Sequence, residues 1–250
     1  EADVTTLSLE ASDGFLPDLD RLRSMVTPET KLIAFTNPNN PTGALIERPM
    51  LEAIADIADS VDAYLLCDEV YRGTGQAGDG MVPSIVDIHH KGISTAGMSK
   101  VFSLAGLRVG WVVAPKELTD KIMIHRDYDT ISVGMINDHF AAIALENADK
   151  VLARSQAITR ENLAILDSWV KNQPRVDWVK PRAGTTAMLK LDIPMSSREF
   201  CIDLLEKTGV MLTPGDAFEM EGYARIGYAN EREILEAGLK EISRYLDVIR

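Results

Sequence analysis

Residues 32–43 read LIAFTNPNNPTG, an apolar run of strand length followed by a turn that contains two prolines and a glycine. Two later segments have the same order of apolar strand and polar end: residues 64–71 read YLLCDEVY and residues 92–100 read GISTAGMSK. Between the first two segments, apolar residues recur at helical spacing from Glu47 to Ser60. This alternation indicates an α/β fold with a mainly parallel sheet flanked by helices.

The remaining pattern predicts two unequal parts. From residue 115 to 173 it is almost entirely helical and ends in one uninterrupted segment, Asp149–Lys171. We therefore predict a large domain, residues 1–148, and a second unit, residues 149–250, made of a connecting helix and a small α+β domain. The other expected strands are Val4–Leu9, Val109–Ala114, Thr186–Leu191 and Arg225–Tyr228, and the other expected helices are Arg198–Lys207 and Glu231–Ile249.

The composition excludes several classes of protein. The 250 residues carry 26 Lys and Arg against 38 Asp and Glu, a net charge of −12, which argues against a nucleic-acid partner. No segment approaches the roughly 20 apolar residues of a membrane helix, so we expect no membrane span. The only cysteines, Cys67 and Cys201, lie far apart, which favours a reducing compartment, and we expect the cytoplasm.

Three familiar motifs are absent or misleading. Gly73, Gly75 and Gly78 match the dinucleotide fingerprint, but no strand runs directly into them and no helix pattern follows, so a flexible loop is expected. The four histidines and two cysteines lack a metal-binding spacing, so no metal site is expected. Ser99 lacks the flanking glycines of a nucleophile elbow.

Polar side chains follow three of the expected strands. An amide in the 37–43 turn would face a ligand at the carboxyl end of the sheet, although the same residues also build ordinary rigid turns. Asp68 is costly to bury unless a cation faces it, either a Lys or Arg or a protonated ring nitrogen. Lys100 is a candidate Schiff-base amine, although a lone lysine is more commonly a surface residue.

Together these segments resemble one enzyme family. The matched order is Asn-Pro-x-Asn-Pro-Thr-Gly at residues 37–43, Asp-x-x-Tyr at 68–71, Ser-Lys at 99–100 and Arg108 eight residues later. It resembles the fold type I pyridoxal phosphate enzymes, class I and II aminotransferases of the aspartate aminotransferase type. Residues 224–227, Ala-Arg-Ile-Gly, resemble the strand of that family that binds a carboxylate. The resemblance spans nearly the whole chain and implies that it begins partway through a longer gene product, without the family's N-terminal third.

The resemblance also implies roles for individual residues. Lys100 corresponds to the lysine that holds pyridoxal 5'-phosphate as a Schiff base and then acts as general base. Asp68 corresponds to the partner of the pyridine nitrogen. The resemblance implies that Tyr71 and Asn40 hydrogen-bond the phenolic oxygen of the cofactor, and that Ser99 and Arg108 bind its phosphate. It also implies that Arg225 binds the substrate carboxylate, with Asn40 near the substrate.

Several functions remain open on the sequence. The resemblance implies a homodimeric transaminase that moves an amino group from an α-amino acid to an α-keto acid. A pyridoxal phosphate lyase, a replacement enzyme or a cyclising enzyme on the same scaffold is the alternative. An inactive fragment is the third reading. The motif residues are shared among these enzymes, so they do not distinguish the reactions.

Overall fold

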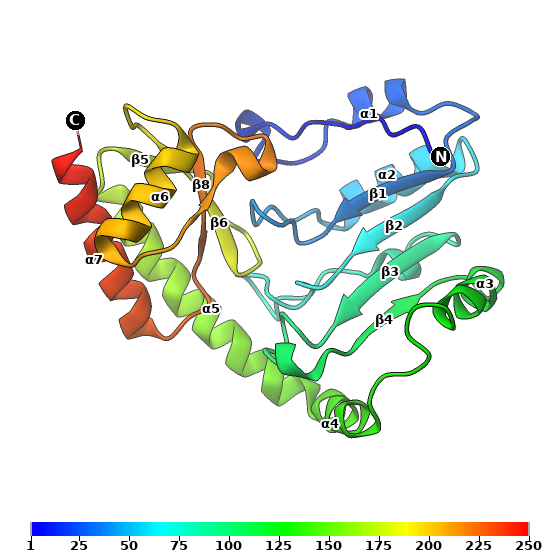
Figure 1. The fold of residues 1–250 in the computed structure, drawn as a ribbon. Helices are drawn as coiled ribbons and strands as arrows, with labels where there is room; N and C mark the ends of the chain where they lie inside the picture. Colours follow the sequence, from blue (N-terminus) through cyan, green and yellow to red (C-terminus); the bar gives the residue numbers. More distant parts are fainter. Residues whose placement is uncertain (1, 250) are drawn as a thin grey trace.

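A computed structural model describes residues 2–249. Figure 1 shows two sheets in different halves of the molecule, with the long helix α5 (Ala148–Lys171) running from one half to the other. Each sheet has four strands. Among the described residues, no helix has the length and apolar character needed to cross a membrane.

The first sheet has the expected mainly parallel arrangement. Its strand order is β1-β2-β3-β4, with β1, β2 and β3 parallel and β4 antiparallel to β3. The register aligns Thr36 with Asp68 and Asp68 with Thr95, so the carboxyl ends of three strands meet at one edge. The strands are β1 (Leu32–Thr36), β2 (Tyr64–Asp68), β3 (Gly92–Gly97) and β4 (Gly110–Val113).

Helix α2 (Arg48–Asp59) covers this sheet with one apolar face, as its spacing predicted. Leu51, Ile54 and Ile57 are buried against Leu65 and Cys67 of β2. Each such side chain stabilises the fold by about 1.5–3 kcal/mol relative to an exposed one. The other helices of this half are α1 (Leu19–Met25), α3 (Lys116–Arg126) and α4 (Met135–Glu146), with single turns η1 (Ala11–Asp13), η2 (Ile85–Asp87) and η3 (Ala105–Leu107).

The second sheet is entirely antiparallel, in the order β5-β6-β8-β7. Its apolar face packs with α5, α6 and α7 in a core that includes Leu189, Phe200 and Leu166, all fully buried. A capping box between Ser196 and Glu199 starts α6. The elements are β5 (Val176–Trp178), β6 (Thr186–Leu191), α6 (Ser197–Thr208), β7 (Thr213–Pro214), η4 (Gly215–Phe218), β8 (Tyr223–Gly227) and α7 (Arg232–Val248).

One expected strand is wrong. Val4–Leu9 forms no strand in the structure, and Val4 is 86% exposed. A strand requires a neighbour that pairs with its backbone, and no described strand pairs with this segment. The sequence also missed α1, β5 and β7, which are short elements with weak periodicity. The division into domains at residue 148 remains a prediction.

Candidate active site

Asp68 lies at the carboxyl end of β2, half-buried between its neighbours. Its Oδ1 accepts hydrogen bonds from the backbone N–H of Val70 at 3.1 Å and from the Thr95 hydroxyl at 3.3 Å. Within residues 2–249, no Lys, Arg or His forms an ion pair with Asp68. A structural salt bridge therefore does not explain this acid in the described part of the chain.

The adjacent Cys67 points into the core on the other face of β2. Burial raises the pKa of its thiol well above the usual range, and the negative charge of Glu69 raises it further. Glu69 itself is buried but accepts hydrogen bonds from the Ser84 hydroxyl at 2.9 Å and the Ile85 N–H at 2.7 Å. Cys67 and Glu69 are thus structural, and Asp68 between them is the acid that faces the sheet edge.

Lys100 and Tyr71 lie beside each other. Lys100 follows β3 by three residues and is exposed, and its ammonium nitrogen lies 6.0 Å from the centroid of the Tyr71 ring. That distance is at the outer limit of a cation–π contact. Tyr71 is buried, and its backbone carbonyl accepts a 2.6 Å hydrogen bond from the Thr74 hydroxyl. The structure therefore brings an amine and a phenol to the edge where Asp68 lies.

Arg225 contacts residues from both halves of the molecule. Its Nη1 donates to Asn40 Oδ1 at 3.1 Å, and its Nη2 donates to the Thr213 hydroxyl at 3.3 Å. The guanidinium carbon also lies 4.9 Å from the centroid of the Phe218 ring. These contacts fix the planar group in one orientation, which a bidentate carboxylate site requires. Sequence reasoning missed Thr213 and Phe218, because only the folded sheet places them beside Arg225.

The 37–43 turn is rigid and docks on the second half. Asn37 accepts from the Ile46 N–H at 2.9 Å and donates to the Ile46 carbonyl at 3.0 Å, which closes the turn. The Gly43 carbonyl accepts from the N–H groups of Arg182 and Ala183. A Cβ at Gly43 would lie 2.5 Å from that of Pro181, so only glycine permits this approach. The turn is therefore both structural and placed to orient Asn40.

Thr74 links the same two halves through hydrogen bonds. Its hydroxyl donates to Tyr71 and accepts from the N–H of Gly184 at 2.7 Å, while the Gly184 carbonyl accepts from the Tyr228 hydroxyl at 2.7 Å. Burial raises the pKa of Tyr228, which keeps this phenol neutral and able to donate. No local sequence pattern indicates this link, because Gly184 lies 110 residues from Thr74 in the sequence.

Arg108 and Ser99 have few partners. Arg108 is exposed, with a left-handed φ of 53°, and its Nη1 donates to the Ala105 carbonyl at 3.0 Å. The Ser99 hydroxyl lies 3.5 Å from the same nitrogen, which is long for a hydrogen bond. These two residues are brought together, with most donors of the guanidinium unused by residues 2–249.

The glycine-rich segment is a loop, as expected. Residues 73–80 contain no helix, and α5 holds them through side chains that donate to backbone carbonyls. Gln156 donates to Gly73 at 2.9 Å and Arg160 to Gly78 at 2.8 Å. The glycine carbonyls thus serve the contact between loop and helix, and the match to the dinucleotide fingerprint was coincidental.

The sequence profile described as aminotransferase class I and II matches residues 1–242. The chain belongs to this family. A "PLP-dependent aminotransferase" from Streptococcus suis superposes with a TM-score of 0.95 at 41% identity, over 99% of this chain and 66% of that one. The "Aspartate aminotransferase" of Pyrococcus horikoshii is 30% identical over 99% of this chain and 64% of its own length.

One similar protein is not named an aminotransferase. The "Capreomycidine synthase" of Streptomyces vinaceus is 31% identical over 95% of this chain and 61% of its own length. The chain thus spans between 61% and 66% of the length of these three proteins. The comparisons confirm the family and the fold that the motifs implied, whereas the roles of single residues remain predictions.

Proposed function

We propose that this chain belongs to a pyridoxal 5'-phosphate-dependent aminotransferase that moves an amino group from an α-amino acid to an α-keto acid. The observation that carries the proposal is Asp68, a half-buried carboxylate at the carboxyl edge of the sheet that no described cation pairs. The other expected residues lie in three pairs, Lys100 beside Tyr71, Asn40 with Arg225, and Arg108 beside Ser99.

The donor set fits this cofactor. Asp68 would hold the pyridine nitrogen protonated, and the neutral amine of Lys100 would bond to the aldehyde carbon with loss of water. Tyr71 and Asn40 would donate hydrogen bonds to the phenolic oxygen. The unused donors of Arg108, with the hydroxyl of Ser99, match phosphate oxygens. When bound, the cofactor supplies an electron sink for the pair released at the substrate α-carbon.

The protein residues then divide the work. Arg225 would bind the substrate α-carboxylate through two parallel N–H···O bonds, and Phe218 and Thr213 keep its fork in place. The Lys100 amine would act as the base that takes the proton from the substrate α-carbon and as the acid that returns it to C4′ of the cofactor. The buried Tyr71 ring restricts where that amine can move.

The test is a half-reaction. The chain is loaded with pyridoxal phosphate and mixed with a panel of L-amino acids in the absence of any keto acid. Transamination yields stoichiometric pyridoxamine phosphate and one keto acid, and adding a second keto acid then restores the starting absorbance. Ping-pong kinetics should accompany this result. Failure to form pyridoxamine phosphate with any amino acid, despite bound cofactor, would contradict transamination.

The relative named a synthase favours a second candidate. A lyase, a replacement enzyme or a cyclising enzyme would use the same residues and release ammonia with a keto acid, or a modified amino acid, instead of pyridoxamine phosphate. Product analysis by mass spectrometry in the same experiment separates these reactions. A chain that binds no cofactor would instead support the reading of an inactive fragment.

The proposal extends to assembly and compartment. Exposed apolar residues cluster on α4, among them Met135, Ile136 and Phe140, which supports a homodimer because large apolar patches mark protein contacts. Both cysteines are free and buried, which supports a reducing compartment such as the cytoplasm. Sedimentation at several protein concentrations tests the first point.

A further inference from the structure

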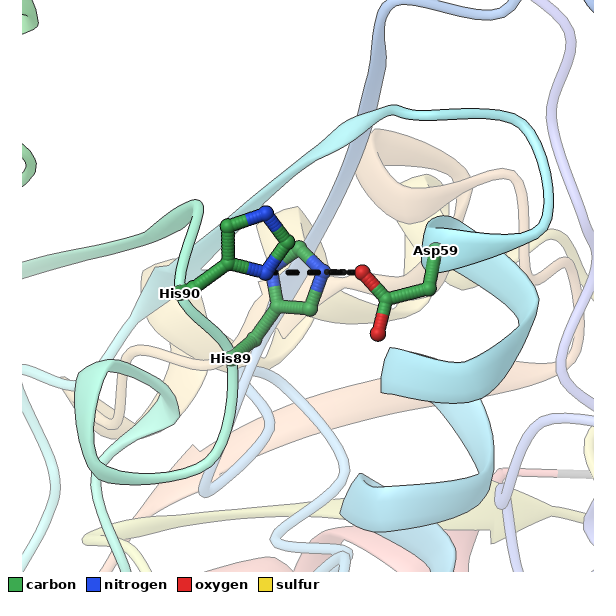
Figure 2. Close-up of side chains that lie close together, drawn as sticks. All are labelled: Asp59, His89 and His90. Atoms are coloured by element: carbon green, nitrogen blue, oxygen red, sulfur yellow. Dashed lines mark hydrogen bonds and ion pairs between the residues drawn. The ribbon is translucent and has the colours of Figure 1, made fainter.

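Three side chains of metal-binding type converge at the amino end of the first sheet. Asp59 is the last residue of α2, and His89 and His90 lie in the connection between η2 and β3. Asp59 Oδ1 lies 2.9 Å from His89 Nε2 and 3.5 Å from His90 Nδ1, and the three atoms lie within 4.8 Å of one another. Figure 2 shows both imidazole rings beside the Asp59 carboxylate.

These separations suit one shared cation. Ligand atoms about 2.0–2.1 Å from a zinc ion lie about 3.3 Å apart at tetrahedral angles. The two contacts of Asp59, 2.9 Å and 3.5 Å, fall on either side of that value. The His90 side chain is 69% exposed, so a change of its rotamer toward solvent can adjust its distance to His89. An ion would therefore need only a small shift of an exposed ring.

One ligand is fixed and the other two are accessible. The His89 side chain is 1% exposed, whereas that of Asp59 is 51% exposed, so water can complete the coordination sphere. Backbone bonds from His89 N–H to the Ile85 carbonyl and from Gly92 N–H to the His89 carbonyl hold the connection. His89 Nδ1 has no partner among the described residues, so no contact there fixes the tautomer, and a metal on Nε2 would replace the proton that this atom shares with Asp59 Oδ1.

The local charge also favours a cation. Asp59 ends α2, where the helix carbonyls carry partial negative charge. The nearby ammonium of Lys91 pairs with Asp62 rather than with Asp59. Among residues 2–249, only the two imidazoles contact the Asp59 carboxylate as possible cations. A carboxylate with two imidazoles suits Zn²⁺ and similar transition-metal ions better than Mg²⁺ or Ca²⁺.

We propose that Asp59, His89 and His90 bind one divalent transition-metal ion, with Zn²⁺ as the reference ligand. The site lies before the first residue of β3, whereas Lys100 follows the last one. Five residue steps along that strand separate the two ends by about 16 Å. The ion would tie the end of α2 to the entry of β3, a structural role that does not depend on the proposed aminotransferase activity. Sequence spacing alone did not indicate it, because Asp59 is 30 residues from His89.

The test uses the 250-residue chain freed of metal by chelation and without pyridoxal phosphate, which itself binds metals. Equilibrium dialysis against Zn²⁺ should give one ion per chain, and Co²⁺ should give visible absorption bands of a site with nitrogen and oxygen ligands. His90→Gln and Asp59→Asn change exposed residues, so both variants should fold. Each should weaken Zn²⁺ binding by about tenfold or more.

His125→Gln is the matched control, because His125 is an exposed histidine on α3, away from the cluster. It should bind Zn²⁺ as the parent does, and Zn²⁺ should raise the melting temperature of the parent and the control but not of His90→Gln. Absence of stoichiometric binding, or equal binding by His90→Gln and the parent, would overturn the proposal. The Asp59 and His89 contact would then be only a hydrogen bond at the end of α2.

Discussion

The two sheets differ in how completely the described residues cover them. In the second sheet, the β6 residues Ala187, Met188 and Leu189 are at most 1% exposed. In the first sheet, Val112 and Val113 of β4 are nearly half exposed. The site residues differ in the same way. Arg225 in the second half has three described partners that fix its orientation, whereas each site residue in the first half has fewer.

This difference indicates that the residues that would position the substrate and those that would carry the reaction lie in different halves of the molecule. In the proposed function, Arg225 of the second half would anchor the substrate, while the first half would supply the groups that carry the reaction, at the strand ends or just after them. Exposed reactive groups can reach a ligand but depend on it for part of their order. We therefore expect substitutions in the first half to remove cofactor chemistry, and those in the second half to weaken substrate binding alone.

Lys100→Ala should have the largest effect. No described lysine other than Lys100 lies beside Tyr71, so the variant should lose the borohydride-reducible cofactor adduct and all turnover. Mass spectrometry of the reduced protein measures the adduct. Lys116→Ala, an exposed lysine at the start of α3, is the control and should keep the adduct. If Lys100→Ala kept the label, the Schiff base would have to form at another residue.

Asp68→Asn should lower the turnover rate by about 10²–10³-fold, because a neutral amide cannot hold a ring nitrogen protonated. The amide oxygen can still accept from Val70 and Thr95, so the fold should remain. Steady-state rates and circular dichroism test both points, with Asp79→Asn on the exposed loop as control. A rate near that of the parent would make Asp68 a structural acid.

Arg225→Lys should weaken amino-acid binding by about 2 kcal/mol, close to 30-fold, because an ammonium group replaces a bidentate hydrogen-bond donor. Cofactor content should change little, because the proposed contact of Asn40 with the cofactor uses its amide N–H, whereas Arg225 contacts only its oxygen. The informative comparison is an amine analogue that lacks the carboxylate. If its binding falls as much as that of the amino acid, the guanidinium does not bind the carboxylate.

The sequence indicated candidate residues in both halves, Arg225 included, but not the side chains that hold Arg225 in place. Asp68, Tyr71 and Lys100 follow apolar strands within short motifs, so the sequence marked them as candidates, and their roles remain predictions. Thr213 and Thr74 have partners on other strands or in the other half, which no local pattern reveals. Val4–Leu9 has the composition of a strand, but pairing depends on a neighbour and not on composition.

Thr74→Val should loosen the link between the halves. It removes the acceptor of the buried Gly184 N–H and the donor to Tyr71, which should cost about 1–3 kcal/mol in the free energy of unfolding. Urea titration measures this. Thr119→Val on α3 removes only a helix hydroxyl bond to Lys116 and should change stability by less than about 0.5 kcal/mol. Equal effects of both variants would mean that Thr74 does not connect the halves.

Thiol labelling gives the smallest effect and compares the two halves directly. Each half buries one cysteine, Cys67 in the first and Cys201 in the second. Burial raises the pKa of Cys201 to about 11, with Asp216 adding to the shift, and raises that of Cys67 further. Because only the thiolate reacts, neither should be alkylated by iodoacetamide near neutral pH in the folded chain, and both should react in urea.

The order of labelling decides between two causes of protection. As the pH rises, Cys201 should react first, because its thiolate forms at lower pH than that of Cys67. Peptide mass spectrometry of partly labelled protein identifies the site. Labelling of Cys67 before Cys201 would require the first half to open while the second stays folded, since ionisation alone gives the opposite order. That result would show that the weaker coverage of the first sheet lowers its local stability, and it would locate the opening at β2.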